Sequence, residues 1–349
     1  MRYQNVCLEA IAYTLPEEVV TSEEIEARLE SVYRRLQLPE GRLELMTGIA
    51  QRRFWPPHTR PGDVSAETAR KALEACALDR RHVGAVVHGS VCRDYLEPAT
   101  ACGVHHRLGL SPQCAIYDVS NACLGLLSGA IQIANMIELG QIRAGLVVGT
   151  ESSRALVETT IEQLIADTSL TRRQIKPALA SLTIGSGSAA MVLVQRELSQ
   201  CGRRLLGGVV RANSSQYELC QGGVDPAGGG QSGPLMATDS EALLQQGVAL
   251  AKEAFCEFLP SVGWSGAKLD RTICHQVGRA HRKLLLDALG LDPAGDYSSF
   301  ERLGNTGSVA LPITAALAAE AGHLQPGHRV ALMGIGSGIN VLILGIEWR

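Results

Sequence analysis

Cys123 has the sequence surroundings of a reactive thiol. It lies between a short apolar segment, residues 115–119, and a long run of helically spaced apolar residues that reaches Ile137. We therefore expect Cys123 at the first turn of a buried helix. Free N–H groups and the positive end of the helix dipole at such a place stabilise a thiolate and lower the pKa of the thiol. The alternative is an inert buried cysteine, which is the commoner fate of a free cysteine.

Two further residues suit thioester chemistry. His275 ends a short predicted strand, 271–275, and Asn305 lies in the Gly-rich segment Gly304–Gly307 before a predicted helix. Taken singly, such a histidine is more often structural, and such an asparagine an ordinary helix cap. Together with Cys123 they would supply a nucleophile that takes an acyl group and two neutral donors for the oxyanion of an enolate.

Composition indicates a large folded protein. The chain has 349 residues, of which 46% are hydrophobic and 19% charged, with 37 glycines and a net charge of −3. This length suits two fused halves or one large α/β unit. The apolar content excludes a disordered chain, and the lack of a concentrated basic stripe argues against nucleic acid as a partner.

The ten cysteines are scattered and form no CxxC pair, so we interpret them as reduced cytosolic thiols. Cys102, His105 and His106 share one predicted helix but lack a second cluster, and we expect no metal site. The apolar segment 6–13 is too short for a signal peptide and contains Glu9, and no apolar run of 18 residues occurs. We expect a soluble, cytoplasmic protein with no integral membrane segment.

Strands and helices alternate along the chain, which predicts an α/β fold with largely buried sheets. Thr21 is expected to cap a helix that continues to Leu36, and Ser65 to cap a helix over 66–77. The other main strands are predicted at 5–12, 83–89, 115–119, 144–149, 182–194, 205–211, 329–334 and 340–347, and the other main helices at 99–108, 157–170, 243–259, 281–289 and 308–321.

The two halves of the chain repeat one pattern. The segment Ile142–Gly149 is similar to His328–Gly334, and each follows a helix that ends in a Gly-containing turn. We divide the chain into residues 1–198, which carry Cys123, and 199–349, which carry His275 and Asn305. A pseudo-twofold duplication would bring the helix behind Cys123 and the helix behind Asn305 together at the centre of the molecule.

These motifs resemble those of the thiolase superfamily, in its ketoacyl synthase III-like branch. The resemblance covers nearly the whole chain and rests on four segments: 118–129, 275–279, 304–307 and 334–338. It implies a five-layered αβαβα fold of two similar halves, a homodimer, and coenzyme A thioesters as substrates with no cofactor. It also implies that Ser337 and Cys123 contribute their backbone N–H groups to an oxyanion position. A papain-like hydrolase uses the same three residue types but would not explain the duplication.

Within this superfamily, the segments 90–98, 121–124, 217–222 and 334–348 are similar to the enzymes that begin long-chain olefin biosynthesis. Those enzymes join two fatty acyl-CoAs head to head and release a 2-alkyl-3-ketoalkanoic acid. An acyl-CoA without a carboxyl group to lose needs a base that removes its α-proton, and Glu97 is our candidate. The resemblance implies that Glu97 enters the partner subunit's site. Leu96 and Ala99 suggest a partly desolvated setting for Glu97, although a solvated loop acid is the default.

The main alternative is a decarboxylating synthase III that uses malonyl-carrier, and a third is a non-catalytic partner with the thiolase fold. Several details stay open: the chain length, the use of CoA or acyl carrier protein, the downstream olefin-pathway partners and the CoA-binding residues. Arg52 and Arg53 would suit a CoA phosphate but also a solvated basic face, and Met46 replaces an arginine of bacterial relatives. Gly185–Gly187 is expected to be a backbone turn at the site, not a phosphate loop, since no lysine follows.

Overall fold

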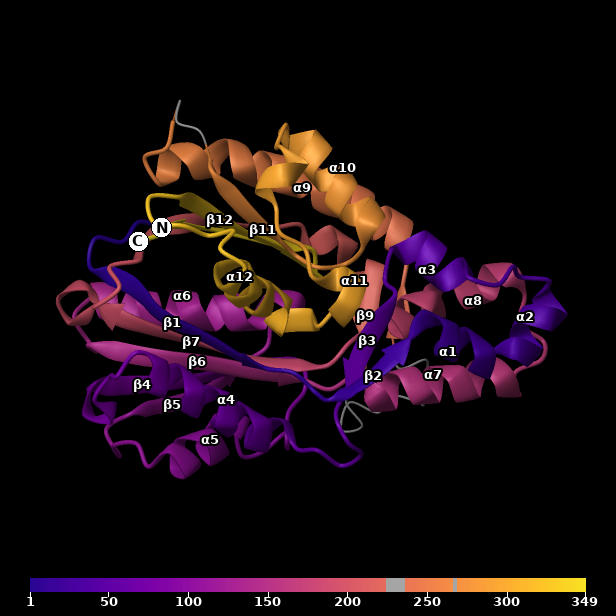
Figure 1. The fold of residues 1–349 in the computed structure, drawn as a ribbon, viewed down its shortest axis with the longest axis horizontal. Coiled ribbons are helices and arrows are strands. Elements are labelled where there is room, and N and C mark those ends of the chain that lie inside the picture. Colours follow the sequence, from indigo (N-terminus) through magenta and orange to yellow (C-terminus); the bar gives the residue numbers. More distant parts are fainter. Residues whose placement is uncertain (224–235, 266–268) are drawn as a thin grey trace.

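The computed structural model describes residues 1–223, 236–265 and 269–349, and its elements form five alternating layers of helix and sheet (Figure 1). This arrangement confirms the predicted αβαβα fold. One outer layer contains α4 and α5, the other contains α9 and α10, and α6 and α12 lie in the middle between the two sheets. Their bounds are Pro61–Ala75, Thr100–Leu108, Ser240–Ser261, Arg279–Leu289, Gly125–Glu138 and Ala310–Glu320.

The two sheets share one strand order over four strands, and the first sheet has β5 as an additional edge strand. From β1 outward the first sheet runs β1-β7-β6-β4-β5, and from β8 outward the second runs β8-β13-β12-β11, the two being joined by the pair Cys7–Arg204. Their matching order agrees with the expected duplication, while the boundary at residues 198 and 199, between β7 and β8, stays a prediction. The strands are β1 Val6–Thr14, β4 Val83–Gly89, β5 Ala115–Val119, β6 Ala144–Glu151, β7 Gly187–Gln195, β8 Arg204–Ala212, β11 Arg271–Cys274, β12 Arg329–Gly336 and β13 Asn340–Glu347.

Helices cover both faces of each sheet, which explains the continuous apolar strands. Strand β6 is buried along its whole length, and β12 along all but its first residue. The central core packs α6 against both sheets, with Leu127, Val147, Leu332 and Leu342 among its members. Parallel strands β4, β5 and β6 all end at one edge, as do β11 and β12, so residues that follow these strands gather there.

A cap of short elements lies beside the sheets: β2 Glu18–Thr21, α1 Ser22–Arg28, α2 Glu30–Leu36, α3 Arg42–Thr47, β3 Gln51–Phe54, α7 Arg154–Ala166, α8 Arg172–Leu179 and α11 Phe300–Leu303. The hairpin of β9 Cys220–Gly222 and β10 Met236–Thr238 contacts α8. Thr21 forms the predicted capping box with Glu24, although the helix breaks at Leu29. The predicted cap at Ser65 is wrong, because α4 already begins at Pro61, whose fixed φ suits a first helical position. None of the helices in the described ranges is long and apolar enough to cross a bilayer.

Tight contact between α6 and the first sheet gives a stability prediction. A Cβ atom on Gly129 of α6 would lie 2.7 Å from Cγ2 of Val147 and 2.9 Å from Cγ1 of Val87. We expect Gly129→Ala to lower the free energy of unfolding by about 1–3 kcal/mol through overpacking. Gly103→Ala in α5 is the matched control. It meets only the end of the Arg107 side chain, so its helix propensity should raise stability by about 0.5–1 kcal/mol. Denaturant unfolding of both variants checks this, and equal effects would contradict it.

Candidate active site

Cys123 lies in a short 3-10 turn, Ala122–Leu124, that leads directly into α6. The position at the helix start is therefore as predicted. Ala122 has a φ of +44°, a left-handed conformation that is unusual for a residue with a Cβ atom. Such local strain occurs at functional sites, where the surrounding structure holds the backbone in place. Here it turns the chain from the end of β5 into the helix and fixes Cys123 at the bend.

The pKa of Cys123 differs from the prediction. The pKa of its thiol is raised to about 12, chiefly by burial and to a smaller extent by the nearby Cys220 and Glu151, while a backbone hydrogen bond acts in the opposite direction. The expected stabilisation by N–H groups is thus present but is outweighed by desolvation. Cys123 rests as a thiol, and its proton has to be transferred when it attacks a thioester.

The carboxyl end of β12 lies against the Cys123 turn. A Cβ atom on Gly336 would lie 3.1 Å from Cγ of Leu124 and 3.6 Å from the backbone nitrogen of Cys123, so a glycine allows this close approach. Ser337 follows directly and is half-buried. The Asn340 amide donates to the Ser337 carbonyl and to Oδ1 of Asn121, both at 3.1 Å. One side chain thereby holds together the turns that carry the two proposed oxyanion N–H groups.

His275 follows β11 and is 3% exposed. Its backbone N–H donates to the Met333 carbonyl of β12 at 2.9 Å, which fixes the residue beside the strand that ends at Gly336. Neither ring nitrogen has a hydrogen-bond partner in the described part of the chain. Burial, and next the neighbouring His281, lower the pKa of His275 to about 3. The imidazole is therefore neutral at physiological pH, with one N–H donor and one acceptor nitrogen free for a substrate.

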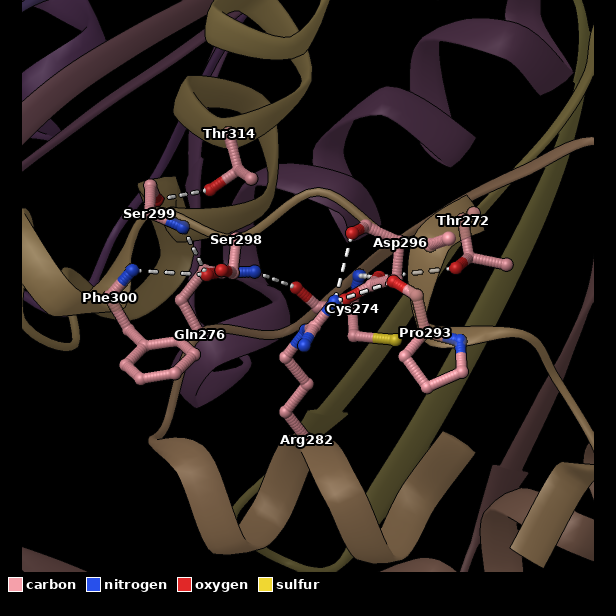
Figure 2. A network of polar contacts seen from close by, with 12 residues as sticks. Thr272, Cys274, Gln276, Arg282, Pro293, Asp296, Ser298, Ser299, Phe300 and Thr314 are labelled. Carbon is pink, nitrogen blue, oxygen red and sulfur yellow. Dashed lines mark hydrogen bonds and ion pairs between the residues drawn. The ribbon is translucent and has the colours of Figure 1, made fainter. Parts of the chain in front are cut away.

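The two sequence neighbours of His275, Cys274 and Gln276, are held by a polar network (Figure 2). Gln276 donates to the Cys274 carbonyl at 2.5 Å and accepts the backbone N–H groups of Ser299 and Phe300 at 2.8 and 3.2 Å. Asp296 holds the same strand end from the other side. It accepts the N–H of Cys274 at 3.1 Å and is paired with Arg282 at 2.6 Å. Since Phe300 begins α11 and α11 leads to Gly304, Gln276 ties the His275 segment to the Asn305 segment.

Asn305 lies between the halves of the molecule. Its backbone N–H donates to the Thr183 carbonyl at 3.0 Å, and its carbonyl accepts the Gly185 N–H at 2.9 Å. Oδ1 of Asn305 accepts the N–H of Gly307 at 3.0 Å, which leaves the Nδ2 end of the amide as the donor. The segment 185–187 therefore lies against Asn305 and leads into β7 at Gly187, without forming the predicted backbone turn. The 3-10 turn Gly307–Val309 contacts the Cys123 turn, so both segments reach the same place.

The fold of a single subunit does not bring Glu97 to the Cys123 turn. Glu97 lies in the exposed loop between Ser90 and Thr100, where Leu96 is 74% exposed. The predicted desolvation of Glu97 is therefore not supplied within one subunit. Both ends of the loop are fixed: Asp94 accepts the Gly62 N–H at 2.8 Å, and Asp118 accepts the N–H groups of Thr100 and Ala101. The loop thus presents apolar side chains and Glu97 away from the body of its own subunit.

Other predicted residues take different places. The interpretation of Arg52 as part of a solvated face is wrong, because Arg52 is fully buried and donates to Ser22 and to the Val20 carbonyl. Burial lowers its pKa to about 10. A ring nitrogen of His105 lies 3.0 Å from the Ser111 carbonyl, and the described residues contain no metal-binding cluster of three or more ligands. Glu151 and Gln276 were not predicted as site residues. The available signal for Glu151 was an acid at the end of a buried strand.

Family models agree with this geometry. "Thiolase, N-terminal domain" matches residues 45–185, and "3-Oxoacyl-[acyl-carrier-protein (ACP)] synthase III C terminal" matches residues 259–348. Together with the five layers and the segments that converge on Cys123, these matches define the class. The chain is an acyltransferase of the thiolase superfamily, of the condensing-enzyme type.

Full-length relatives narrow this class. The chain is 43% identical to an acyl-CoA:acyl-CoA alkyltransferase of Shewanella oneidensis and 36% identical to one of Xanthomonas campestris, and in both cases the match covers 100% of each protein. A crystal structure of Xanthomonas campestris OleA, a cysteine-to-serine variant with bound lauric acid and lauroyl-CoA, superposes with a TM-score of 0.92 at 36% identity. That match covers 99% of this chain and 100% of the other. The chain belongs to the acyl-CoA:acyl-CoA alkyltransferase family.

Buried histidines predict a pH-dependent stability. The pKa of His88 and His281 is lowered to about 4, and that of His275 to about 3, in each case chiefly by burial. The unfolded chain binds protons below the ordinary histidine pKa of about 6.5, whereas these folded residues do not. Stability is therefore full above that pKa and falls as the pH drops from about 6.5 toward 4. We expect a loss of about 1 kcal/mol per histidine between pH 7 and 5.5.

Denaturant unfolding at the two pH values measures this loss. His281→Gln should lose its share of the pH dependence, whereas the exposed control His106→Gln should keep the full dependence. A stability that is constant down to pH 5 would contradict the neutral, buried histidines.

Proposed function

We propose that this protein condenses two fatty acyl-CoAs without decarboxylation and releases a 2-alkyl-3-ketoalkanoic acid. The observation that carries the proposal is the full-length match, at 43% identity, to an acyl-CoA:acyl-CoA alkyltransferase. The site supports it with a half-buried thiol and with a neutral histidine whose ring nitrogens have no partner among the described residues. Among its solved relatives, one binds lauroyl-CoA, which supports a long-chain acyl-CoA as the substrate.

Acyl transfer to Cys123 is the first step. The Cys123 sulfur attacks the thioester carbonyl, and the neutral imidazole of His275 takes the thiol proton. The tetrahedral oxyanion accepts hydrogen bonds from the backbone N–H groups of Cys123 and Ser337. As the C–S bond to coenzyme A breaks, the departing thiolate takes the proton back from His275. The products of this step are acyl-Cys123 and free coenzyme A.

Enolate formation and condensation follow. The Glu97 carboxylate of the partner subunit removes the α-proton of the second acyl-CoA, and the N–H of His275 and the Nδ2 group of Asn305 donate to the enolate oxygen. The α-carbon attacks the carbonyl of acyl-Cys123, and Cys123 leaves as a thiolate that recovers a proton. Water then hydrolyses the remaining CoA thioester, which gives the β-keto acid and coenzyme A.

A homodimer belongs to this proposal, because Glu97 is exposed on its own subunit and the loop around it carries exposed Val91, Tyr95 and Leu96. Burial of these side chains against a second subunit would also remove Glu97 from water. We assign the two thiolase halves to residues 1–198 and 199–349 and the location to the cytoplasm. Downstream enzymes of an olefin pathway are the proposed consumers of the β-keto acid.

The alternative is a decarboxylating synthase III that uses malonyl-carrier. Product analysis by mass spectrometry, with myristoyl-CoA alone and with malonyl-CoA or its carrier form added, distinguishes the two. The proposed function predicts a condensed β-keto acid, or the ketone formed by its loss of carbon dioxide, from myristoyl-CoA alone. Condensation only in the presence of a malonyl substrate would overturn the proposal. Cys123→Ala is the control and should give neither product.

Because Asn305 is proposed to donate only to the enolate, its loss should slow condensation but not acylation. Asn305→Ala should leave the formation of acyl-Cys123 within a few-fold of wild type and slow condensation by about 10² to 10³, since one enolate donor is lost. His275→Ala should slow condensation to a similar extent and also slow acylation, because it removes the acceptor of the thiol proton. Quench-flow with intact-protein mass spectrometry measures both steps. An equal loss of both steps in Asn305→Ala would contradict its assignment.

The base role predicts a different pattern for Glu97. Glu97→Gln should form acyl-Cys123 at the wild-type rate and produce almost no condensed product from two acyl-CoAs, because the α-proton has no acceptor. Glu40→Gln, at another exposed acid, is the control and should condense normally. Retention of most of the condensation activity by Glu97→Gln would exclude Glu97 as the base.

A further inference from the structure

Glu151 is a buried acid that joins the segment after Asn305 to the root of the loop that carries Glu97. It ends β6, is 5% exposed, and accepts four hydrogen bonds. Two come from Ser308, from Oγ at 2.5 Å and from the backbone N–H at 3.3 Å. The other two come from the backbone N–H groups of Val91 at 3.1 Å and Cys92 at 3.3 Å. All four groups donate, so the side chain acts only as an acceptor, as a carboxylate does.

The segments held by Glu151 carry two proposed catalytic groups. Ser308 lies three residues after Asn305, and Cys92 lies five residues before Glu97. The contact with the first segment is close, because a Cβ atom on Gly307 would lie 3.2 Å from Cγ of Glu151. One carboxyl group therefore joins the donor amide of one site to the root of the loop whose Glu97 serves the other site of the proposed dimer.

Glu151 also acts on the nucleophile. Burial raises the pKa of Cys123 and of Cys92, and the nearby Glu151 adds to both shifts. Besides burial, the ionisable groups that raise the pKa of Cys123 are Cys220 of β9 and Glu151 of β6. No basic side chain of the described residues lies within ion-pair distance of Glu151, so its charge near the thiol is not compensated by a cation.

A second buried acid, Glu9, serves as a control that distinguishes a structural role from a role in condensation. Glu9 of β1 is 7% exposed and accepts Oγ of Ser199 at 2.6 Å and the N–H groups of Gln200 and Cys201 at 3.0 and 3.2 Å. Glu9 thus has nearly the same burial and donor set as Glu151. It fixes a turn between β7 and β8, which carries none of the proposed site residues.

We propose that Glu151 is a positioning residue for condensation, which holds the Asn305 segment in place beside Cys123 and fixes the root of the loop that carries Glu97 into the partner subunit's site. This proposal rests on the proposed function, since it assigns Asn305 and Glu97 their roles in condensation. Loss of the carboxylate would let both loops move by fractions of an ångström, and misplacement of about 1 Å at a reacting centre costs about 10² in rate.

The test compares Glu151→Gln with its matched control Glu9→Gln in the full-length protein. We expect both variants to lose similar thermal stability. Only Glu151→Gln should show faster hydrogen exchange at residues 91–97 and 304–308, and only this variant should condense myristoyl-CoA at least about tenfold more slowly relative to its own acylation rate. Iodoacetamide should also alkylate Cys123 of Glu151→Gln faster at a given pH, because a repelling charge is gone. Peptide mapping should show buried Cys7 and Cys274 still unmodified in both variants.

The proposal is overturned if Glu151→Gln retains wild-type exchange in both loops and a wild-type ratio of condensation to acylation. It is also overturned if Glu9→Gln shows the same changes, since these would then reflect general destabilisation. Hydrogen exchange and alkylation do not require condensation. A wild-type enzyme that forms no product from acyl-CoA alone would therefore refute the proposed function, while these two measurements still decide whether Glu151 holds the loops and acts on Cys123.

Discussion

The contact between the Cys123 turn and the carboxyl end of β12 is the constraint on which the site depends. A Cβ atom on Gly336 would lie 3.1 Å from Cγ of Leu124, so a larger residue would press on the side chain next to Cys123. Through this contact the end of the second sheet reaches a turn of the first half, and the Asn340 amide joins the two. His275, on the strand parallel to β12, is carried to the same edge. The order of the strands in the layered fold thereby determines where the proposed catalytic groups lie.

Burial has two consequences in this arrangement. It holds His275 neutral, so that the imidazole can donate to an enolate and accept a thiol proton, and it also raises the pKa of Cys123. In the proposed mechanism, the thiol transfers its proton to the neutral imidazole only as the thioester is attacked. The same desolvation that opposes a free thiolate strengthens each hydrogen bond to an oxyanion. The site therefore favours charge on the substrate oxygen over charge on the resting sulfur.

Patterns that depend on local chemistry were predictable from the sequence. Strands β4 and β5 have the predicted bounds because apolar runs end at Gly or polar residues, and Thr21 forms the expected capping box. The family resemblance supplied the five layers, which periodicity alone does not determine. Properties set by distant neighbours were not predictable. Arg52 is buried by segments far away in the sequence, the pKa of Cys123 depends on enclosure by several elements, and Glu151 becomes notable only when Ser308 and Cys92 are seen around it.

The central claim is that one active site combines Cys123, His275 and Asn305 of one subunit with Glu97 of the other. Mixing two inactive variants, Cys123→Ala and Glu97→Gln, after dissociation and reassociation of subunits tests this most directly. In a mixed dimer, the site that retains Cys123 receives an intact Glu97 from its partner, so about a quarter of the wild-type condensation activity should return in a random mixture. Failure of the mixture to regain activity, with mixed dimers demonstrated by native mass spectrometry, would contradict a site shared between subunits.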